Sequence, residues 1–262
     1  MKNIAVLIDF TDGCKIALHQ CRILAELTGA RIHAVHVSKD GTDDVEHLML
    51  SAFVTEEIGS AIPLTTHIFD GRVLKALKEG IAAIHPDLVV LCTHGIQGIV
   101  QRLFGANVLK LVQAVPTTFL VVQENTHVDE RGFQKILFPA THSPHADLLI
   151  QQITSVAAEC DSEVVLYEID KYFSDVEADI KKNFEAAKKA FKAKGVSYSH
   201  VKEQPASHSL GFARQTLDYA EANGIGLIAT LSEVIDSGFL MMKSDKETLL
   251  TNEKGIPVLA CG

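Results

Sequence analysis

"KNIAVLIDFTDGCKIALHQCRILAELTGARIHAVHV", residues 2–37, contains in order an apolar run, a short polar turn, an amphipathic helical pattern that ends near Gly29, and a second apolar run. "QKILFPATHSPHADLLIQQITSVAAECDSEVVLYEI", residues 134–169, has the same order with nearly the same spacing. A unit that recurs in this way indicates a duplicated structural element. The sequence therefore predicts one strand–helix–strand unit used twice, as the start of two similar halves.

Each half continues with alternating strand and helix signals. They lie at 64–69, 71–83, 87–93, 106–114 and 117–123 in the first half, and at 196–201, 210–222, 226–231, 246–252 and 257–262 in the second. A charged pattern at 170–195 predicts a long helix that packs Phe184 and Phe191 on the sheet, with a partner-docking face as the alternative. Apolar strands that alternate with helices predict a parallel sheet covered on both faces. The predicted fold class is α/β, with two tandem five-stranded parallel-sheet α/β sandwiches.

The boundary between the halves is predicted from composition. "ENTHVDERGFQ", residues 124–134, is polar and has the character of a linker, which predicts domains at 1–125 and 133–262. The last strand of each half, at 119–123 and 258–262, is strongly apolar for a sheet edge, and such an edge favours pairing. We therefore expect these two strands to pair, which makes the chain a pseudo-symmetric internal dimer.

Size and charge limit the classes of partner. The chain has 262 residues, 47% of them hydrophobic, so it can form a substantial core. Its net charge of -9, without a local Lys/Arg run, disfavours nucleic acid and anionic membrane surfaces as partners. The apolar segment 1–10 has the length of a strand and contains Asp9, which is typical of neither a signal peptide nor a membrane span. A cytoplasmic location is therefore expected.

The cysteines are not spaced like a disulfide framework or a zinc site. They are Cys14, Cys21, Cys92, Cys160 and Cys261, an odd number with no CxxC pair. Reduced cysteines that fill the core are the expectation.

The candidate ligand site follows from the predicted topology. In an open parallel sheet, ligands bind beyond the carboxyl ends of the strands, where the strand order reverses. In the first half this edge contains Asp9 and Phe10, Val37, and the segment 92–107.

These stretches resemble the universal stress protein family. The resemblance covers nearly the whole chain as two copies, and it is carried best by "VLIDFTDGCKIAL", "HAVHV", "FDGRVLKAL" and "DLVVLCTHG…LFGANVLKLVQAVPTTFLVV" of the first half. It implies a fold like that of the adenine nucleotide alpha hydrolases. Members that hold ATP share G-x2-G-x9-G-[ST] after the fourth strand, an acidic residue after the first and an aliphatic residue after the second.

The first half matches this pattern in part. Gly95 and Gly105 keep the nine-residue interval, Asp9 is the acidic residue and Val37 the aliphatic one, whereas Cys92 replaces the first glycine and Ala106 the Ser or Thr. Glycines allow backbone N–H groups to approach phosphate oxygens, and a following helix N-terminus favours an anion. The hydroxyl missing at Ala106 removes a hydrogen bond to a charged oxygen, worth about 1.5 to 3 kcal/mol.

Other residues of the loop have two readings each. Asn107 either donates to a phosphate or caps the following helix. Thr93 and His94 open the loop, and His94 either contacts the phosphates or bonds to nearby backbone. Arg102 either reaches the γ-phosphate or lies in solvent, and Cys92 either has a redox or ligand role or is a buried, unreactive strand end.

The second half has a weaker pattern. Thr141 or His142 stands at the position where the family pattern has an acidic residue, and Gly238 is the only glycine kept in the loop. Glu233 and Asp236 place negative charge near the pocket, which would repel phosphate. No nucleotide is expected there.

A metal site at the start of the second half is an alternative reading of its turn. His142, His145 and Asp147 carry side chains that ligate divalent metals. The simpler reading is a polar turn in which Ser143 caps a helix that has Pro144 at its first position.

The resemblance implies a cytoplasmic stress-response or regulatory protein. Its first half is expected to bind ATP or a related adenine nucleotide, with Mg as the accompanying ion, and its second half to be a structural or partner-binding copy. An unidentified protein partner and a further homodimer are compatible with this expectation. Catalysis beyond slow nucleotide turnover has little support, and no metal ligands are assigned. The alternatives are a nucleotide-independent interaction module and a metal-dependent hydrolase centred on His142 and His145.

Overall fold

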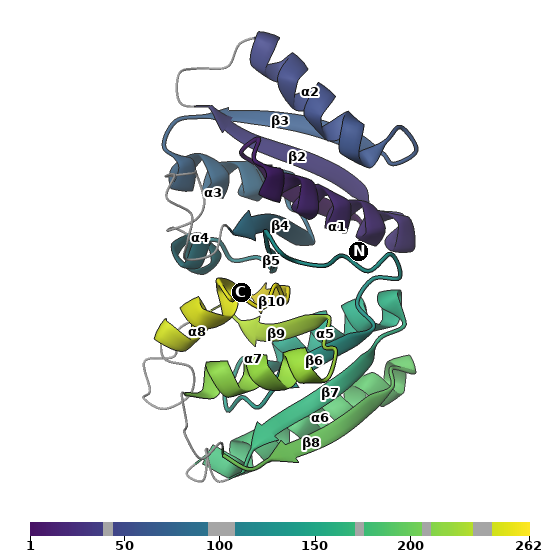
Figure 1. Cartoon of the computed structure of the whole chain (residues 1–262), viewed down its shortest axis with the longest axis vertical. Coiled ribbons are helices and arrows are strands. Elements are labelled where there is room, and N and C mark those ends of the chain that lie inside the picture. Colours follow the sequence, from purple (N-terminus) through teal and green to yellow (C-terminus); the bar gives the residue numbers. More distant parts are fainter. Residues whose placement is uncertain (39–43, 94–107, 171–175, 206–210, 233–242) are drawn as a thin grey trace.

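The structure is a computed structural model, and it describes residues 1–38, 44–93, 108–170, 176–205, 211–232 and 243–262. In this part of the chain ten strands form one sheet (Figure 1). The strands are β1 (Asn3–Ile8), β2 (Arg31–Ser38), β3 (Leu64–Asp70), β4 (Leu88–Thr93), β5 (Phe119–Gln123), β6 (Lys135–Pro139), β7 (Glu163–Ile169), β8 (Tyr198–Glu203), β9 (Leu227–Leu231) and β10 (Val258–Cys261). Their order is β3-β2-β1-β4-β5-β10-β9-β6-β7-β8, so each half supplies five neighbouring strands.

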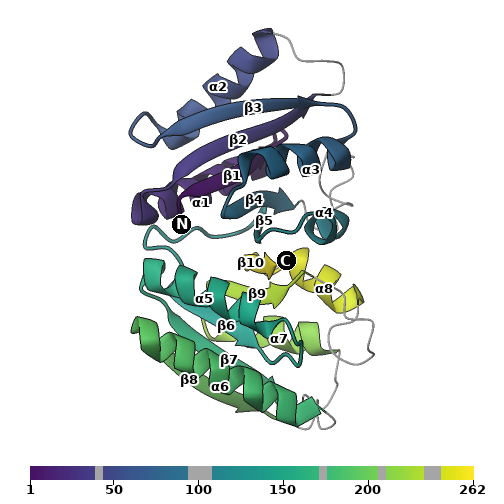
Figure 2. The same ribbon diagram turned by 180° about the vertical axis from the view of Figure 1, so that it is seen from behind.

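Helices cover both faces of this sheet. They are α1 (Asp12–Thr28), α2 (Asp44–Ile58), α3 (Val73–Ile84), α4 (Val108–Ala114), α5 (Ala146–Cys160), α6 (Glu177–Lys194), α7 (Phe212–Ala222) and α8 (Lys243–Leu250). Contacts join α1 to α2 and α5, and α5 to α6, while α8 contacts α4 and α7. Because the sheet twists, α1 and α2 lie in front of its upper part in Figure 1, whereas α7 lies in front of its lower part. In Figure 2, seen from behind, α3 lies in front of the upper part and α5 and α6 in front of the lower part.

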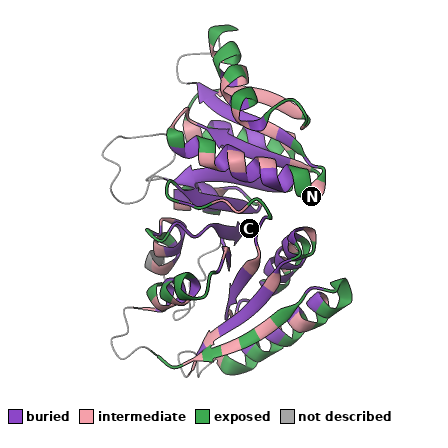
Figure 3. Cartoon of the chain, turned by 45° about the vertical axis from the view of Figure 1, so that its right-hand side comes forward, coloured by how far each residue is buried: buried purple, intermediate pink, exposed green. Residues whose placement is uncertain are grey.

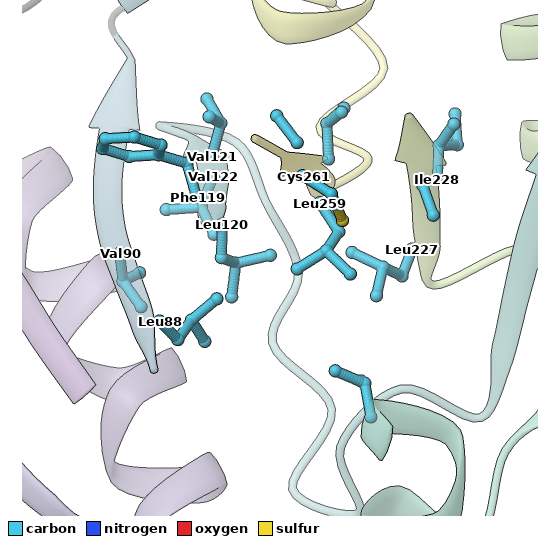
Figure 4. Packing of buried hydrophobic residues seen from close by; sticks show 14 of the residues in the cluster. Leu88, Val90, Phe119, Leu120, Val121, Val122, Leu227, Ile228, Leu259 and Cys261 are labelled. Carbon is cyan, nitrogen blue, oxygen red and sulfur yellow. The ribbon is translucent and has the colours of Figure 1, made fainter. Parts of the chain in front are cut away.

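The seam between the halves is the pairing of β5 with β10. These strands run antiparallel, with Val121 opposite Val258 and Leu120 opposite Leu259, whereas the other paired strands are parallel. Both strands are fully buried, and their apolar side chains, such as Leu120 and Leu259, lie close together at the seam (Figure 4). The predicted internal pseudo-dimer is confirmed, together with the fold class.

Burial follows the place of each strand in the sheet. The central strands β1, β4, β5, β9 and β10 are buried along almost their whole length, as expected for parallel strands covered on both faces (Figure 3). The outer strands β3 and β8 are only half-buried. The hydrophobic core is therefore continuous through the seam.

Polar contacts also cross between the halves. The Gln123 side-chain amide donates to the backbone oxygen of Leu250 at 3.2 Å. Arg22 of α1 bonds Glu130, in the segment that joins the halves, with Nη2 to Oε2 at 3.0 Å. These bonds fix the connection against the first half.

Several helix bounds differ from the sequence-based predictions. Helix α1 ends as predicted at Gly29, whose positive φ of 70° lets its N–H donate to the Ala25 oxygen at 2.8 Å. Helices α3 and α7 begin two residues later than predicted, and α8 begins and ends earlier. The helix at 170–195 is described from Glu177, and its start at 171–175 lies outside the described residues. Helix α2 was not predicted, because its sequence is apolar on more than one side.

A pair of histidines, His33 and His67, lies on the neighbouring strands β2 and β3. His33 Nδ1 is 3.0 Å from His67 Nε2, and His33 Nε2 is 3.3 Å from Asn3 Oδ1. Burial lowers the pKa of His33, with His67 and Arg31 contributing, and burial also lowers the pKa of His67. The folded protein therefore favours the neutral form of both rings.

This pair makes stability depend on pH. A folded-state pKa below the unfolded value of about 6.5 means that the unfolded chain takes up protons first as the pH falls. The free energy of unfolding contributed by the pair is thus fully present above about pH 6.5 and decreases below it. We expect the double variant His33→Gln/His67→Gln to lose less stability than the wild type between pH 7.5 and pH 5 in urea unfolding. Equal losses in both proteins would contradict this assignment.

The seam gives a second prediction. Leu259 is 1% exposed and faces Leu120 across the seam, so Leu259→Ala leaves a cavity that the two packed halves cannot close. The expected loss in the free energy of unfolding is about 2 to 5 kcal/mol, measured by chemical denaturation. As a control, Leu74→Ala on α3, where Leu74 is 40% exposed, should change it by less than about 0.5 kcal/mol. A Leu259→Ala protein as stable as the control would show that the seam is not tightly packed.

Candidate functional site

The strand order of the first half creates a switch point between β1 and β4. From β1 the chain continues to β2 and β3 on one side, and then returns to β4 and β5 on the other. In open parallel sheets, ligands bind beyond the carboxyl ends of the strands at a point of this kind. Asp9 and Phe10 follow β1 directly, and Cys92 and Thr93 are the last residues of β4.

Asp9 is held by the turn that leads into α1. Its Oδ1 accepts hydrogen bonds from Thr11 Oγ1 at 2.6 Å, from Thr11 N at 3.2 Å and from Cys14 Sγ at 2.8 Å. The Asp9 side chain is only partly buried. One carboxylate oxygen thus orders the turn while the group as a whole stays accessible at the edge of the sheet.

Phe10 adopts a conformation that is unusual for its residue type. Its φ is 58°, in the left-handed region, which costs a bulky residue about 1 to 3 kcal/mol. The ring lies 4.8 Å from the His36 ring and 5.5 Å from the Phe53 ring of α2. Packing of Phe10 between β2 and α2 therefore offsets the backbone strain and fixes the turn after β1.

Cys92 and Thr93 are buried at the end of β4. Cys92 is 4% exposed, and Thr93 Oγ1 donates to the Val122 oxygen at 3.5 Å. Burial raises the pKa of the Cys92 thiol, with further contributions from Cys14, Glu124 and Asp9. Burial and the Asp9 carboxylate also raise the pKa of Cys14, to about 12. These thiols are protonated at neutral pH, which makes them poor nucleophiles.

Val37 lies one strand away from the switch point. It is buried in β2, where it pairs with Phe69 of β3, and the strand continues for one residue beyond it to Ser38. Asp9, Phe10, Val37, Cys92 and Thr93 are thus gathered at one edge of three adjacent strands. The remaining predicted site residues lie outside the described residues: His94, Gly95, Arg102, Gly105, Ala106 and Asn107.

Two residues that were not predicted as part of the site, His36 of β2 and Glu46 of α2, join this edge to α2. His36 is 7% exposed, with Nδ1 at 2.8 Å from the Ile8 oxygen and Nε2 at 3.2 Å from Glu46 Oε1. The alternation of "HAVHV" places His36 on the same side of β2 as the apolar Ala34, so no sequence signal separated it from the core.

The segment after the first strand of the second half keeps one hydrogen bond of the turn after β1 without the carboxylate. Thr141 Oγ1 accepts from Ser143 N at 3.2 Å, as Asp9 Oδ1 accepts from Thr11 N. The predicted helix start, with Ser143 as cap and Pro144 at the first position, is wrong: α5 begins at Ala146 with His145 at the N-cap position, and Ser143 Oγ accepts from His145 N at 3.1 Å. One hydrogen bond of the turn is therefore kept, whereas the positive φ of Phe10 has no counterpart at His142 and the negative charge is lost.

The three residues considered for a metal do not form a ligand set. Across the described ranges, no three His, Cys, Asp or Glu side chains are grouped as a metal ion requires. His145 and Asp147 are exposed at the start of α5, whereas burial lowers the pKa of His142 against the opposing effect of Asp179 of α6. The structure thus gives the metal-dependent reading no support.

The second half also has a buried cation that the sequence analysis missed. Lys246 of α8 is 5% exposed, and its Nζ donates to the Leu231 oxygen, at the end of β9, at 2.8 Å. Glu233 and Asp236, predicted to repel phosphate here, lie outside the described residues.

Two pockets in the described part of the chain flank the seam. One of about 360 Å³ is lined by residues such as Asp87, Thr118 and Gln152, and one of about 470 Å³ by residues such as His145 and Ser232. Neither includes Asp9 or Val37, so they are separate from the predicted site.

Comparison with known proteins finds a matching family. Residues 1–123 match the model of the universal stress protein family. The first half is therefore similar to this family, which confirms for residues 1–123 the resemblance seen in the sequence. No curated protein matches the sequence.

Solved structures extend the likeness of fold to the whole chain. A protein from Pseudomonas aeruginosa UCBPP-PA14 assigned to the universal stress proteins is 17% identical with a TM-score of 0.66, covering 100% of this chain and 93% of its own. A universal stress protein from Archaeoglobus fulgidus DSM 4304 is 12% identical with a TM-score of 0.69, covering 99% and 95%. The cytoplasmic domain of a prokaryotic cation chloride cotransporter is 10% identical with a TM-score of 0.55, covering 99% and 94%. These likenesses show the tandem fold.

Within the ranges that the structure describes, none of the helices combines the length and apolar character needed to cross a membrane.

Buried thiols lead to a prediction about reactivity. All five cysteines are unpaired and buried, and burial raises the pKa of each, so we expect fewer than one thiol per chain to react with Ellman's reagent at pH 7.5. Unfolding in guanidinium chloride should expose all five. Rapid labelling of the native protein that disappears in Cys92→Ser would instead favour a reactive role for Cys92.

Proposed function

We propose that the first half binds ATP or a related adenine nucleotide, with Mg, and that the chain is a cytoplasmic regulatory protein of the stress response. The observation that supports this most is the partly exposed Asp9 carboxylate at the rim of the β1/β4 switch point. In this proposal the two domains are residues 1–125 and 133–262.

Each residue at this edge has a role that its chemistry fits. Asp9 is an acceptor for the ribose hydroxyls or the adenine amino group, because Thr11 and Cys14 hold its carboxylate in place. Val37 is the aliphatic residue that the resemblance gives to the adenine and ribose side, and its buried side chain holds the end of β2 in place there. The backbone around Gly95 and Gly105 approaches the phosphates, by the sequence pattern that these glycines keep. The nucleotide brings Mg with its phosphates, and no residue of this chain is assigned to the ion.

The second half acts as a structural and partner-binding copy. Thr141 stands where the first half has Asp9, and Asn183 of α6 donates to the backbone oxygens of Thr141 and Ser143 at 2.9 and 3.1 Å. This turn is closed by the chain's own side chains, which favours a role without nucleotide.

A nucleotide-independent interaction module is the second candidate. It is favoured by Asp9 Oδ1, which already accepts three hydrogen bonds from the chain, and by the apolar residues that α2 exposes. In this alternative the residues at the switch point maintain the fold, and the surfaces carry the function.

Calorimetric titration with Mg-ATP separates the two candidates. We expect saturable binding at micromolar to low millimolar concentrations, and loss of binding in Gly105→Glu because a long acidic side chain meets the phosphates. Asp9→Asn keeps an acceptor for Thr11 but removes the charge, so the affinity should fall by about tenfold, the effect of about 1.4 kcal/mol.

A matched control uses the neighbouring carboxylate. Asp12 is exposed in the first turn of α1, and Asp12→Asn should bind as the wild type does. Thermal unfolding of each variant checks that the turn is intact. Absence of heat and of a thermal shift at several millimolar Mg-ATP would leave the interaction module.

A further inference from the structure

Helix α2 presents apolar side chains on two sides. Leu50, Val54 and Ile58 are buried against the sheet and α1. On the opposite side, Val45, Leu48 and Met49 are 62%, 71% and 56% exposed, and Ala52 is also exposed. These residues, which we call the outer stripe, follow the i, i+3, i+4, i+7 spacing of one helix face.

The second half shows that this exposure is not a requirement of the fold. Helix α6 has the place of α2: it connects the second and third strands of its half and packs on α5 as α2 packs on α1. Its inward residues are apolar, whereas its exposed residues are mainly charged, among them Lys181, Lys182, Glu185, Lys189 and Lys192. The outer stripe is therefore a property of α2 itself, and grouped exposed apolar residues of this kind mark interaction sites.

Charge indicates what the outer stripe binds. Residues 40–58 contain the acidic residues Asp40, Asp43, Asp44, Glu46, Glu56 and Glu57 and no Lys or Arg. Asp44 and Glu56 are exposed near the two ends of the outer stripe. Negative charge on this scale repels anionic lipid and a second copy of the same helix, and favours a partner with positive charge.

We propose that the outer stripe of α2 docks a cationic amphipathic helix of another protein. The apolar side of such a helix covers Leu48 and Met49, while its Lys or Arg residues lie beside Asp44 and Glu56. The stripe spans about two helical turns, roughly 10 Å, so the contact is small and fits a transient complex. This inference goes beyond nucleotide binding and does not depend on it.

A model helix tests the proposal on the full chain. The probe is a fluorescein-labelled, 18-residue peptide of Leu, Lys and Ala with its leucines in one stripe, followed by anisotropy in 150 mM NaCl. We expect a Kd on the order of 10 µM, as for a weak, small interface. Leu48→Gln/Met49→Gln should weaken binding at least tenfold, because Gln keeps the helix but removes the apolar surface.

Four controls make the result specific to the outer stripe. Leu74→Gln alters an exposed leucine on α3, 40% exposed, and should leave the Kd within twofold. A peptide of the same composition with its leucines scattered, and one with Glu in place of Lys, should bind at least tenfold more weakly. Thermal unfolding of the double variant should match the wild type, because both replaced side chains are exposed.

Other outcomes would overturn the proposal. Failure of the peptide to bind the wild type, or equal binding to Leu48→Gln/Met49→Gln, removes the outer stripe as the docking surface. Tight binding of the acidic peptide contradicts the role of charge. A dimer in light scattering that Leu48→Gln/Met49→Gln dissolves would assign the stripe to a second copy of this chain instead.

Discussion

The antiparallel pairing of β5 with β10 is the constraint on which the whole architecture depends. Each half has a parallel sheet whose last strand is apolar on both sides, and such a strand cannot remain at an open edge without inviting association. Joining the two edges satisfies their backbone groups and makes one hydrophobic core from two. The seam thus holds the two halves together, and the differences between the halves lie in their surfaces and turns.

Much of this architecture is predictable from sequence because it depends on patterns that repeat. Apolar strands, helix periodicity and the apolar last strands each recur in both halves, so the sheet, its layers and the seam follow from local rules. Helix ends are less certain, as α3 and α8 show, because a terminal turn is set by a few hydrogen bonds. Helix α2 could not be recognised, because apolar residues on two sides leave no single stripe to detect.

The candidate site was predictable only in outline. The switch point and the residues Asp9, Val37 and Cys92 follow from strand order, which the repeats determine. The conformation of Phe10 could not be foreseen, because a positive φ at a phenylalanine is held by tertiary packing on His36 and Phe53. Likewise, nothing in the sequence indicated that His36 would contact Glu46, a residue of a helix that had no sequence signature.

Duplication has left the two halves with related turns and different chemistry. Asp9 and Thr141 accept equivalent backbone hydrogen bonds, and Asp9 also accepts hydrogen bonds from Thr11 Oγ1 and Cys14 Sγ. The same comparison applies to α2 and α6, since the sheet needs only their inward faces. The first half has two features that the second half lacks, the Asp9 carboxylate and the exposed apolar side of α2. Both lie near α2, whose inner side contacts His36 and Phe10, the residue after Asp9, and whose outer side is apolar and exposed. Both sites that we propose therefore lie in the first half, around this helix and the adjacent edge of the sheet.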